Sequence, residues 1–72
     1  MTTDELLALI KTRTPEQLQD LLTSLRRERR SLEPQYRTAR RTRDGVALLQ
    51  ITASITRLDH QMAQVRYELS TR

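Results

Sequence analysis

The sequence has no cysteine, tryptophan or phenylalanine, and it has only one glycine and two prolines. Small secreted domains usually depend on disulfides, so the lack of cysteine favours a reducing compartment. The scarcity of turn-forming residues argues against a β-sandwich or barrel. The apolar residues are mainly leucine, isoleucine, alanine and valine, which suit the packing of helices. We therefore predict an all-α fold.

Residues that bind metals or catalyse reactions are also scarce. His60 is the only histidine, and its neighbour Asp59 does not face it on a helix, because adjacent helical residues point in different directions. A metal site would lack its commonest ligands without cysteine or a second histidine. One glycine is too few for a glycine-rich phosphate-binding loop. We predict a protein that is not an enzyme and carries no metal or cofactor.

Long apolar runs are absent as well. No stretch approaches the roughly 20 apolar residues that a membrane span needs. The short apolar run at residues 6–10 is flanked by Asp4, Glu5 and Lys11, which is unlike the hydrophobic region of a secretory signal. We expect a cytoplasmic protein with no membrane partner.

Positive charge is present in excess and is concentrated in one segment. The 72 residues, enough for a single domain (1–72), carry a net charge of +4. Residues 1–25 have a net charge of −2, residues 26–43 one of +6, and residues 44–72 are balanced. Such a local imbalance is typical of one contact surface.

Three helices are predicted, over about residues 3–11, 15–43 and 46–70. Thr2 and Glu5 fit a capping box before the first helix. Thr14 is a good N-cap for the second helix, which has Pro15 at its first position. The third helix has the clearest pattern, because its apolar residues recur at intervals of three and four over three heptads. This seam consists of Leu48, Ile51, Ile55, Leu58, Met62, Val65 and Leu69.

The second and third helices have similar lengths and a short link, so they should form an antiparallel hairpin. This register places Leu25 near Val65 and Leu32 near Leu58. The short first helix would fold over the open end of the hairpin. The alternative is a parallel or antiparallel homodimer built on the seam of the third helix, so both a monomer and a homodimer stay open.

Two positions are expected to shape the hairpin locally. Pro34 interrupts the second helix, and we predict either a kink or a brief break there, because proline removes one amide and clashes with the preceding turn. Asp44 and Gly45 form the strongest turn signal after Thr14. Gly45 is expected to adopt a positive φ and close the second helix.

Six arginines of the second helix are predicted to share one side of it. At 100° per residue they lie within about 60° of Arg26, beside the apolar stripe. Arginine pairs through its planar fork with phosphate or carboxylate. We predict contact with the backbone of RNA or DNA, or with an acidic protein groove; the alternative is an ordinary solvated face. The band consists of Arg26, Arg29, Arg30, Arg37, Arg40 and Arg41.

The remaining features favour packing or are ambiguous. Tyr36 and Tyr67 are expected to pack against the helices, which argues against a base-stacking platform. The third helix also has a polar face with few charges, either an interface rim or a solvated surface. This face consists of Gln50, Thr52, Ser54, Thr56, Gln61 and Gln64.

In its size, its charge and the segment from Leu25 to Arg43, the chain resembles small Xanthomonas-phage regulators of bacterial RNA polymerase. The resemblance implies a transcription inhibitor and antitermination factor that docks on the polymerase, displaces sigma and acts near the RNA exit channel. Residues 26–43 would then face the exit channel while an apolar helix patch docks on the polymerase.

A second resemblance is architectural. Small type III secretion co-chaperones of needle subunits are also short helical hairpins with an extra N-terminal helix. This likeness implies a helical-repeat partner. A structural helical dimer is the third possibility.

Overall fold

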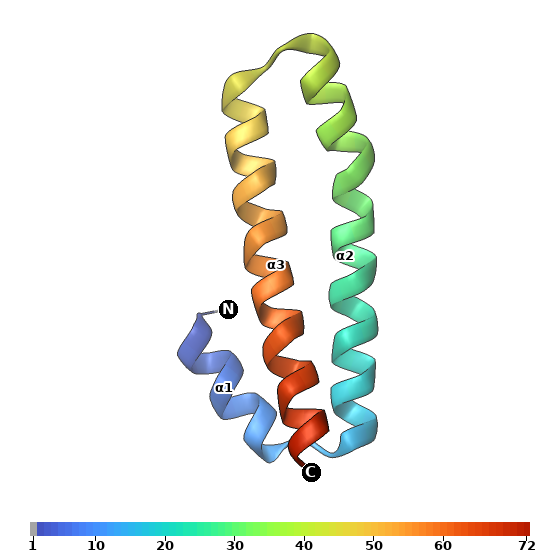
Figure 1. Cartoon of the computed structure of the whole chain (residues 1–72), viewed down its shortest axis with the longest axis vertical. Helices are drawn as coiled ribbons and strands as arrows, with labels where there is room; N and C mark the ends of the chain where they lie inside the picture. Colours follow the sequence, from blue (N-terminus) through green and yellow to red (C-terminus); the bar gives the residue numbers. More distant parts are fainter. Residues whose placement is uncertain (1) are drawn as a thin grey trace.

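The computed structural model describes residues 2–72, and within this range the chain forms three α-helices and no strand. They are α1 (Thr3–Thr12), α2 (Pro15–Thr42) and α3 (Gly45–Thr71). α2 and α3 form a long antiparallel hairpin, and α1 lies beside α3 at the end opposite the α2–α3 turn (Figure 1). The predicted all-α fold is therefore confirmed, with each helix boundary within one residue of the expected position.

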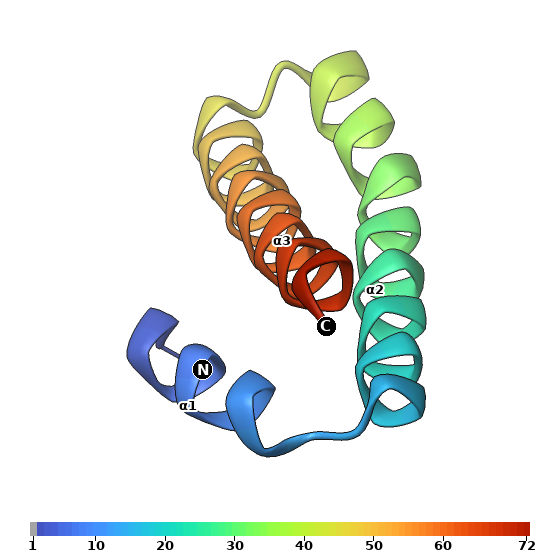
Figure 2. The same ribbon diagram turned by 60° about the horizontal axis from the view of Figure 1, so that its bottom comes forward.

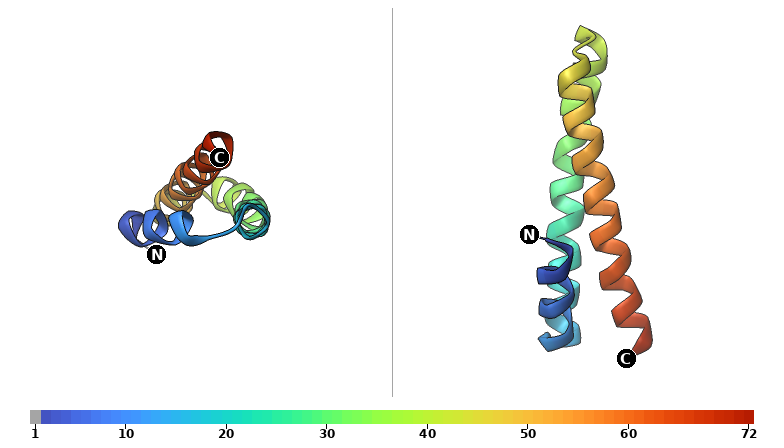
Figure 3. Two further views of the ribbon diagram at one scale, coloured as in Figure 1. Left: turned by 90° about the horizontal axis from the view of Figure 1, so that it is seen from below. Right: turned by 90° about the vertical axis from the view of Figure 1, so that its left-hand side faces the viewer.

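The three helices are not in contact over the same length, because α1 is much shorter than α2 and α3. Seen from the open end, α1, α2 and α3 stand at the corners of a triangle (Figure 3, left). α1 reaches only part of the way along the hairpin, and the rest consists of α2 and α3 alone (Figure 3, right). We call the three-helix part the base and the two-helix part the distal half.

Capping boxes begin α1 and α2. The sequence predicts the one at Thr2 and, for α2, an N-cap at Thr14. The Thr2 hydroxyl accepts a hydrogen bond from the Glu5 amide at 3.2 Å, and the Glu5 carboxylate accepts one from the Thr2 amide at 3.4 Å. Thr14 and Gln17 form the same reciprocal pair at 3.2 and 2.9 Å. These bonds satisfy amides that have no partner within the helix, and so fix where each helix starts.

The core lies in the base. Buried leucines of α2 meet α1 on one side and the second half of the α3 seam on the other. Within the seam, Leu58, Met62 and Val65 are buried, and Leu69 packs against them. In the described chain, the seam of the predicted homodimer alternative packs instead against the chain's own helices. The core cluster consists of Leu6, Ile10, Leu18, Leu22, Leu25, Leu58, Met62 and Val65.

The distal half is packed less completely, although the seam continues into it. Leu48, Ile51 and Ile55 are half-buried, as is Leu32 of α2. Ala39 is the one buried residue of α2 beyond Leu25 in the described chain. Two helices cannot enclose a seam from all sides, so these residues keep contact with solvent.

Pro34 lies inside α2, and the helix continues through it without a break. Of the two outcomes predicted at this position, a separation into two helices is therefore wrong. Pro34 is exposed, so the Arg30 carbonyl, which loses its usual amide partner, is not enclosed in the core. The apolar phase of α2 on both sides of Pro34 keeps the helix packed on α3.

The turn between α2 and α3 differs from the sequence prediction. The residue with positive φ is Arg43 (φ 54), and Gly45 is an ordinary first residue of α3. The amide of Asp44 donates to the Ala39 carbonyl at 3.0 Å and that of Arg43 to the Arg40 carbonyl at 3.3 Å, which is a Schellman motif. The Asp44 carboxylate then accepts from the Ala47 amide and begins α3. The Schellman motif ends α2 and the Asp44 N-cap begins α3, so the left-handed residue must lie immediately before Asp44. That residue is Arg43.

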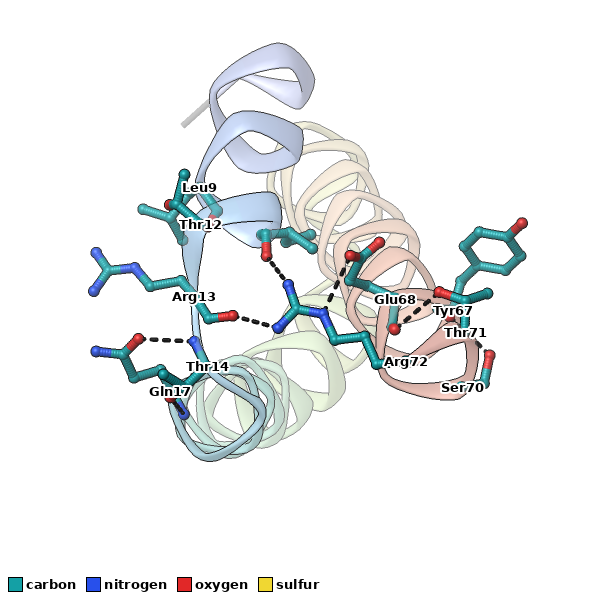
Figure 4. A network of polar contacts seen from close by, with 11 residues as sticks. Leu9, Thr12, Arg13, Thr14, Gln17, Tyr67, Glu68, Ser70, Thr71 and Arg72 are labelled. Carbon is teal, nitrogen blue, oxygen red and sulfur yellow. Dashed lines mark hydrogen bonds and ion pairs between the residues drawn. The ribbon is translucent and has the colours of Figure 1, made fainter.

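Arg72 fastens α1 to the hairpin. Its guanidinium donates to the Ile10 carbonyl at 2.8 Å and to the Arg13 carbonyl, and it pairs with Glu68 at 3.3 Å (Figure 4). The link between α1 and α2 therefore runs past the end of α3, as Figure 2 shows. Cations at a helix C-terminus satisfy its last carbonyls and interact well with its dipole.

Candidate functional site

The predicted arginine band lies on one side of α2. The buried leucines Leu18, Leu22 and Leu25 hold an adjacent side of the helix against α1 and α3. Helical spacing then places the arginines beside this buried stripe, where their guanidinium groups reach the border between α2 and α3. Five of the six predicted residues are exposed, and Arg29 is half-buried.

A first hollow of about 370 Å³ lies at this border. Arg26, Arg29 and Arg30 of α2 line it together with Arg66 of α3. The carboxylates of Glu33 and Asp59 also line this hollow, and Met62 contributes to it. Four guanidinium groups against two carboxylates leave the hollow with a positive charge, which suits an anionic group.

Arg29 is held within the chain. Its Nε donates to Asp59 Oδ1 at 2.7 Å, and its Nη1 lies 3.4 Å from Glu33 Oε1. The pair with Asp59 joins α2 to α3, so Arg29 fixes the hairpin register on this side. A ligand anion would have to compete with Asp59 for Arg29, whereas Arg26, Arg30 and Arg66 have no carboxylate within ion-pair distance in the described residues.

A second hollow of about 350 Å³ follows along the same border. Arg29 and Arg37 line it, together with Glu33, Tyr36 and Ile55. The Arg40 guanidinium lies over the Tyr36 ring, 5.9 Å from its centroid, which is within the range of a cation–π contact. Tyr36 is half-buried, as its phase predicts. It thereby orders Arg40 beside the second hollow.

Not every predicted residue belongs to this arrangement. Arg41 is exposed in the last turn of α2 and lines neither hollow. Tyr67 was expected to pack, but its side chain is 69% exposed on α3, so that prediction is wrong. We define the arginine surface by the residues that the two hollows and Tyr36 bring together: Arg26, Arg29, Arg30, Arg37, Arg40 and Arg66.

Sequence reasoning missed Arg66 and the two carboxylates. The signal for Arg66 was present, because a register that pairs Leu25 with Val65 places Arg66 level with Ser24, within one helical turn of Arg26. The balancing role of Asp59 and Glu33 depends on side-chain rotamers, which the periodicity does not determine. The arginine surface thus draws on two helices, whereas the predicted band belonged to one.

Two other kinds of feature, metal sites and membrane-spanning helices, are not found among the described residues. Residues 2–72 contain no group of three or more histidine or acidic side chains placed to hold a metal ion. None of the helices in this part of the chain has both the length and the apolar character that crossing a membrane requires.

The arrangement can therefore bind an anionic surface through several guanidinium groups on a stiff helical support. Comparisons with known proteins give no further guide: the chain matches no protein-family model, and neither a curated protein nor a solved structure shows significant similarity to it.

Proposed function

We propose that the chain is a non-enzymatic binding protein that presents its arginine surface to a polyanion. The observation that supports this most is the convergence of Arg26, Arg30 and Arg66, from two helices, on one hollow without an ion-pair partner for any of them. Clustered like charges repel each other, so an arrangement of this kind gains most when an anion joins it.

The target we propose is bacterial RNA polymerase, in the cytoplasm of the host. The resemblance to phage regulators of transcription supports this choice, and so does the shape of the molecule, a narrow hairpin with principal extents of 44 × 20 × 16 Å. A rod of this kind can place guanidinium groups in a groove lined by nucleic-acid phosphates or by protein carboxylates. Arginine suits both, because its fork pairs bidentately with either group.

The first experiment is capture of purified bacterial RNA polymerase by the immobilised chain, with and without nuclease. We expect capture with and without nuclease if protein carboxylates of the polymerase contact the arginine surface. We expect capture that nuclease abolishes if nucleic-acid phosphates supply the contact. Absence of polymerase from the bound fraction in both arms would refute the polymerase as the target.

The second experiment tests the arginine surface itself. The triple variant Arg26→Gln/Arg30→Gln/Arg37→Gln changes exposed residues, so the helical fold should persist and can be checked by circular dichroism. Its control is Arg57→Gln, which removes one positive charge, against three in the triple variant, from a hollow on another side of the hairpin. The two variants are compared by the loss of binding per charge removed.

With labelled RNA or DNA, a phosphate contact predicts that log affinity falls with log salt by about 0.9 for each duplex phosphate contacted. The triple variant should flatten this slope, whereas the control should not. Equal binding by both variants would show that the arginine surface is not the contact.

A further inference from the structure

α3 carries a second row of residues at heptad spacing, on the side opposite its buried seam. The row begins with Val46, Leu49, Ala53 and Thr56. The same spacing continues through His60, Ala63 and Tyr67. Each member stands two residues before a seam residue, which rotates it by about 200° around the helix. We call these seven positions the outer row.

The outer row is exposed. All seven members belong to the exposed class, and the Tyr67 side chain stands out from the surface of α3 (Figure 4). The exposed large hydrophobic residues of α3 in the described chain are all members: Val46 is 68% exposed, Leu49 75% and Tyr67 69%.

The outer row also lacks charge. None of its members is Asp, Glu, Lys or Arg, and residues 46–56 contain no such residue at all, in a chain that is 31% charged. The cores of protein interfaces are depleted in charge and enriched in aromatic residues. Five of its seven members are apolar, and exposed apolar patches mark interaction sites on soluble proteins, so the outer row has the features of a docking surface.

A matching hollow lies at one end of the row. α1 runs along the edge of α3 there, and together they enclose a hollow of about 410 Å³. Leu7 and Ile10 of α1 line it, together with Ala63 and Tyr67 of α3. The polar side chains in its wall are Lys11, His60, Gln64 and Glu68. Two of the three exposed large hydrophobic residues of α3, Val46 and Leu49, stand at the other end of the same row. One face thus holds both protruding side chains and an apolar hollow to receive them.

We propose that a second copy of the chain docks antiparallel on the outer row, so that Val46 and Leu49 of each copy enter the hollow of the other. With the two-fold axis near Thr56, Leu49 of one copy faces Ala63 of the other. Ala53 likewise faces His60, so larger side chains meet smaller ones. Such a contact uses the same surface on both copies and closes on itself.

A parallel pairing does not give this fit. It would place Leu49 against Leu49 and Ala63 against Ala63, which leaves gaps where small residues meet, and neither hollow would be filled. Antiparallel packing also sets the two α3 dipoles in opposite directions, which is electrostatically favourable. The nearest charged neighbour of the row centre, Arg57, lines a hollow with Leu25 and Glu28 on the α1 side.

Sedimentation equilibrium of the full chain over a concentration series tests the association. We expect a monomer–dimer equilibrium, and Leu49→Glu should raise the dimer dissociation constant at least tenfold, because it replaces an apolar side chain of the contact with a carboxylate that must lose its water on docking. Leu49 is exposed in the monomer, so the variant should keep its helical fold. Gln19→Glu, which adds the same charge on exposed α2, should leave the dissociation constant unchanged.

Cysteine cross-linking tests the direction. Because the chain has no cysteine, single-cysteine variants report one position each. Thr56→Cys lies at the proposed axis and should form a disulfide dimer under mild oxidation. Val46→Cys should not, since its two copies would lie about 30 Å apart. A mixture of Val46→Cys with Tyr67→Cys should form the crossed dimer.

Three results would overturn the proposal: a monomer at millimolar concentration, a dimer that Leu49→Glu does not weaken, or equal cross-linking of Val46→Cys and Thr56→Cys. The triple arginine variant described above should dimerise normally, so a failure of polyanion binding and a failure of dimerisation can be told apart.

Discussion

The base and the distal half of the hairpin use the same heptad seam but bury it to different extents. Leu58 and Val65 in the base are 2% and 0% exposed, whereas Leu48, Ile51 and Ile55 in the distal half are half-buried. The residue types are the same, so intrinsic hydrophobicity does not explain the difference. α1 does, because it adds a third wall to the base and stops before the distal half. The comparison shows that a heptad seam predicts which side of a helix is apolar. The extent to which that side is buried depends on the other helices that pack against it.

The sharpest test of this comparison uses one residue type at two points on the seam. Leu58→Ala should lower the free energy of unfolding by about 3 kcal/mol, because it removes a buried side chain and leaves a cavity. Leu48→Ala should lower it by about 1 kcal/mol, because its site is already in contact with solvent. Urea denaturation followed by circular dichroism measures both. Equal losses would contradict the role that we give to α1.

Removing the fastening of α1 should weaken the base selectively. Arg72→Ala loses the hydrogen bonds to the Ile10 and Arg13 carbonyls, which should destabilise the docked α1 by about 1 kcal/mol. Hydrogen exchange should then speed up in α1 more than in the distal half of α2. The control is Arg66→Ala, which removes an arginine of α3 without touching α1. Uniform acceleration along the chain would mean that α1 is not a separate unit.

A smaller effect is expected at the turn that closes the distal half. Arg43→Gly should raise the free energy of unfolding by about 1 kcal/mol, because glycine adopts the left-handed conformation without the strain of a Cβ atom. Gly45→Ala should add about 0.5 kcal/mol, since Gly45 has no positive φ and a Cβ atom there meets nothing within 4 Å. Thermal melts of both variants measure these gains. A loss of stability in Arg43→Gly would show that the arginine side chain itself stabilises the turn.

The smallest expected effect concerns the ion pair that joins α2 and α3. Asp59→Asn should lower the free energy of unfolding by about 0.5 kcal/mol, because both side chains of its pair with Arg29 are substantially exposed. The same change frees Arg29 for an anion, so polyanion affinity should rise while stability falls. Fluorescence anisotropy and a thermal melt of the same sample check the two directions. A fall in affinity would mean that Asp59 orders Arg29 for binding.

Local signals in the sequence predicted most of the fold. The capping boxes at Thr2 and Thr14 act over three residues, and the seam depends only on the helical repeat, so both survive in the folded chain. The prediction failed at Gly45, because the Schellman motif that ends α2 depends on backbone bonds and not on the residue best suited to positive φ. It failed at Tyr67 as well, since its position near the seam did not show that the ring turns outward.

The arginine surface was predicted in part. The helical repeat placed Arg26, Arg30 and Arg37 on one side of α2 and placed Tyr36 in the apolar phase. It did not give Arg66, which comes from the facing helix, or the pairing of Arg29 with Asp59. Both depend on how two helices meet side by side, which a pattern within one helix does not contain.

The sequence alone determined the number of helices, their ends and the apolar side of each, because capping and the 3.6-residue repeat are local properties of the chain. Only the tertiary structure decided that α1 covers half of the seam, that Arg66 joins the arginines of α2 and that the outer row of α3 stays open. The reason is physical: burial and the neighbours of a charge depend on residues that are far apart along the chain.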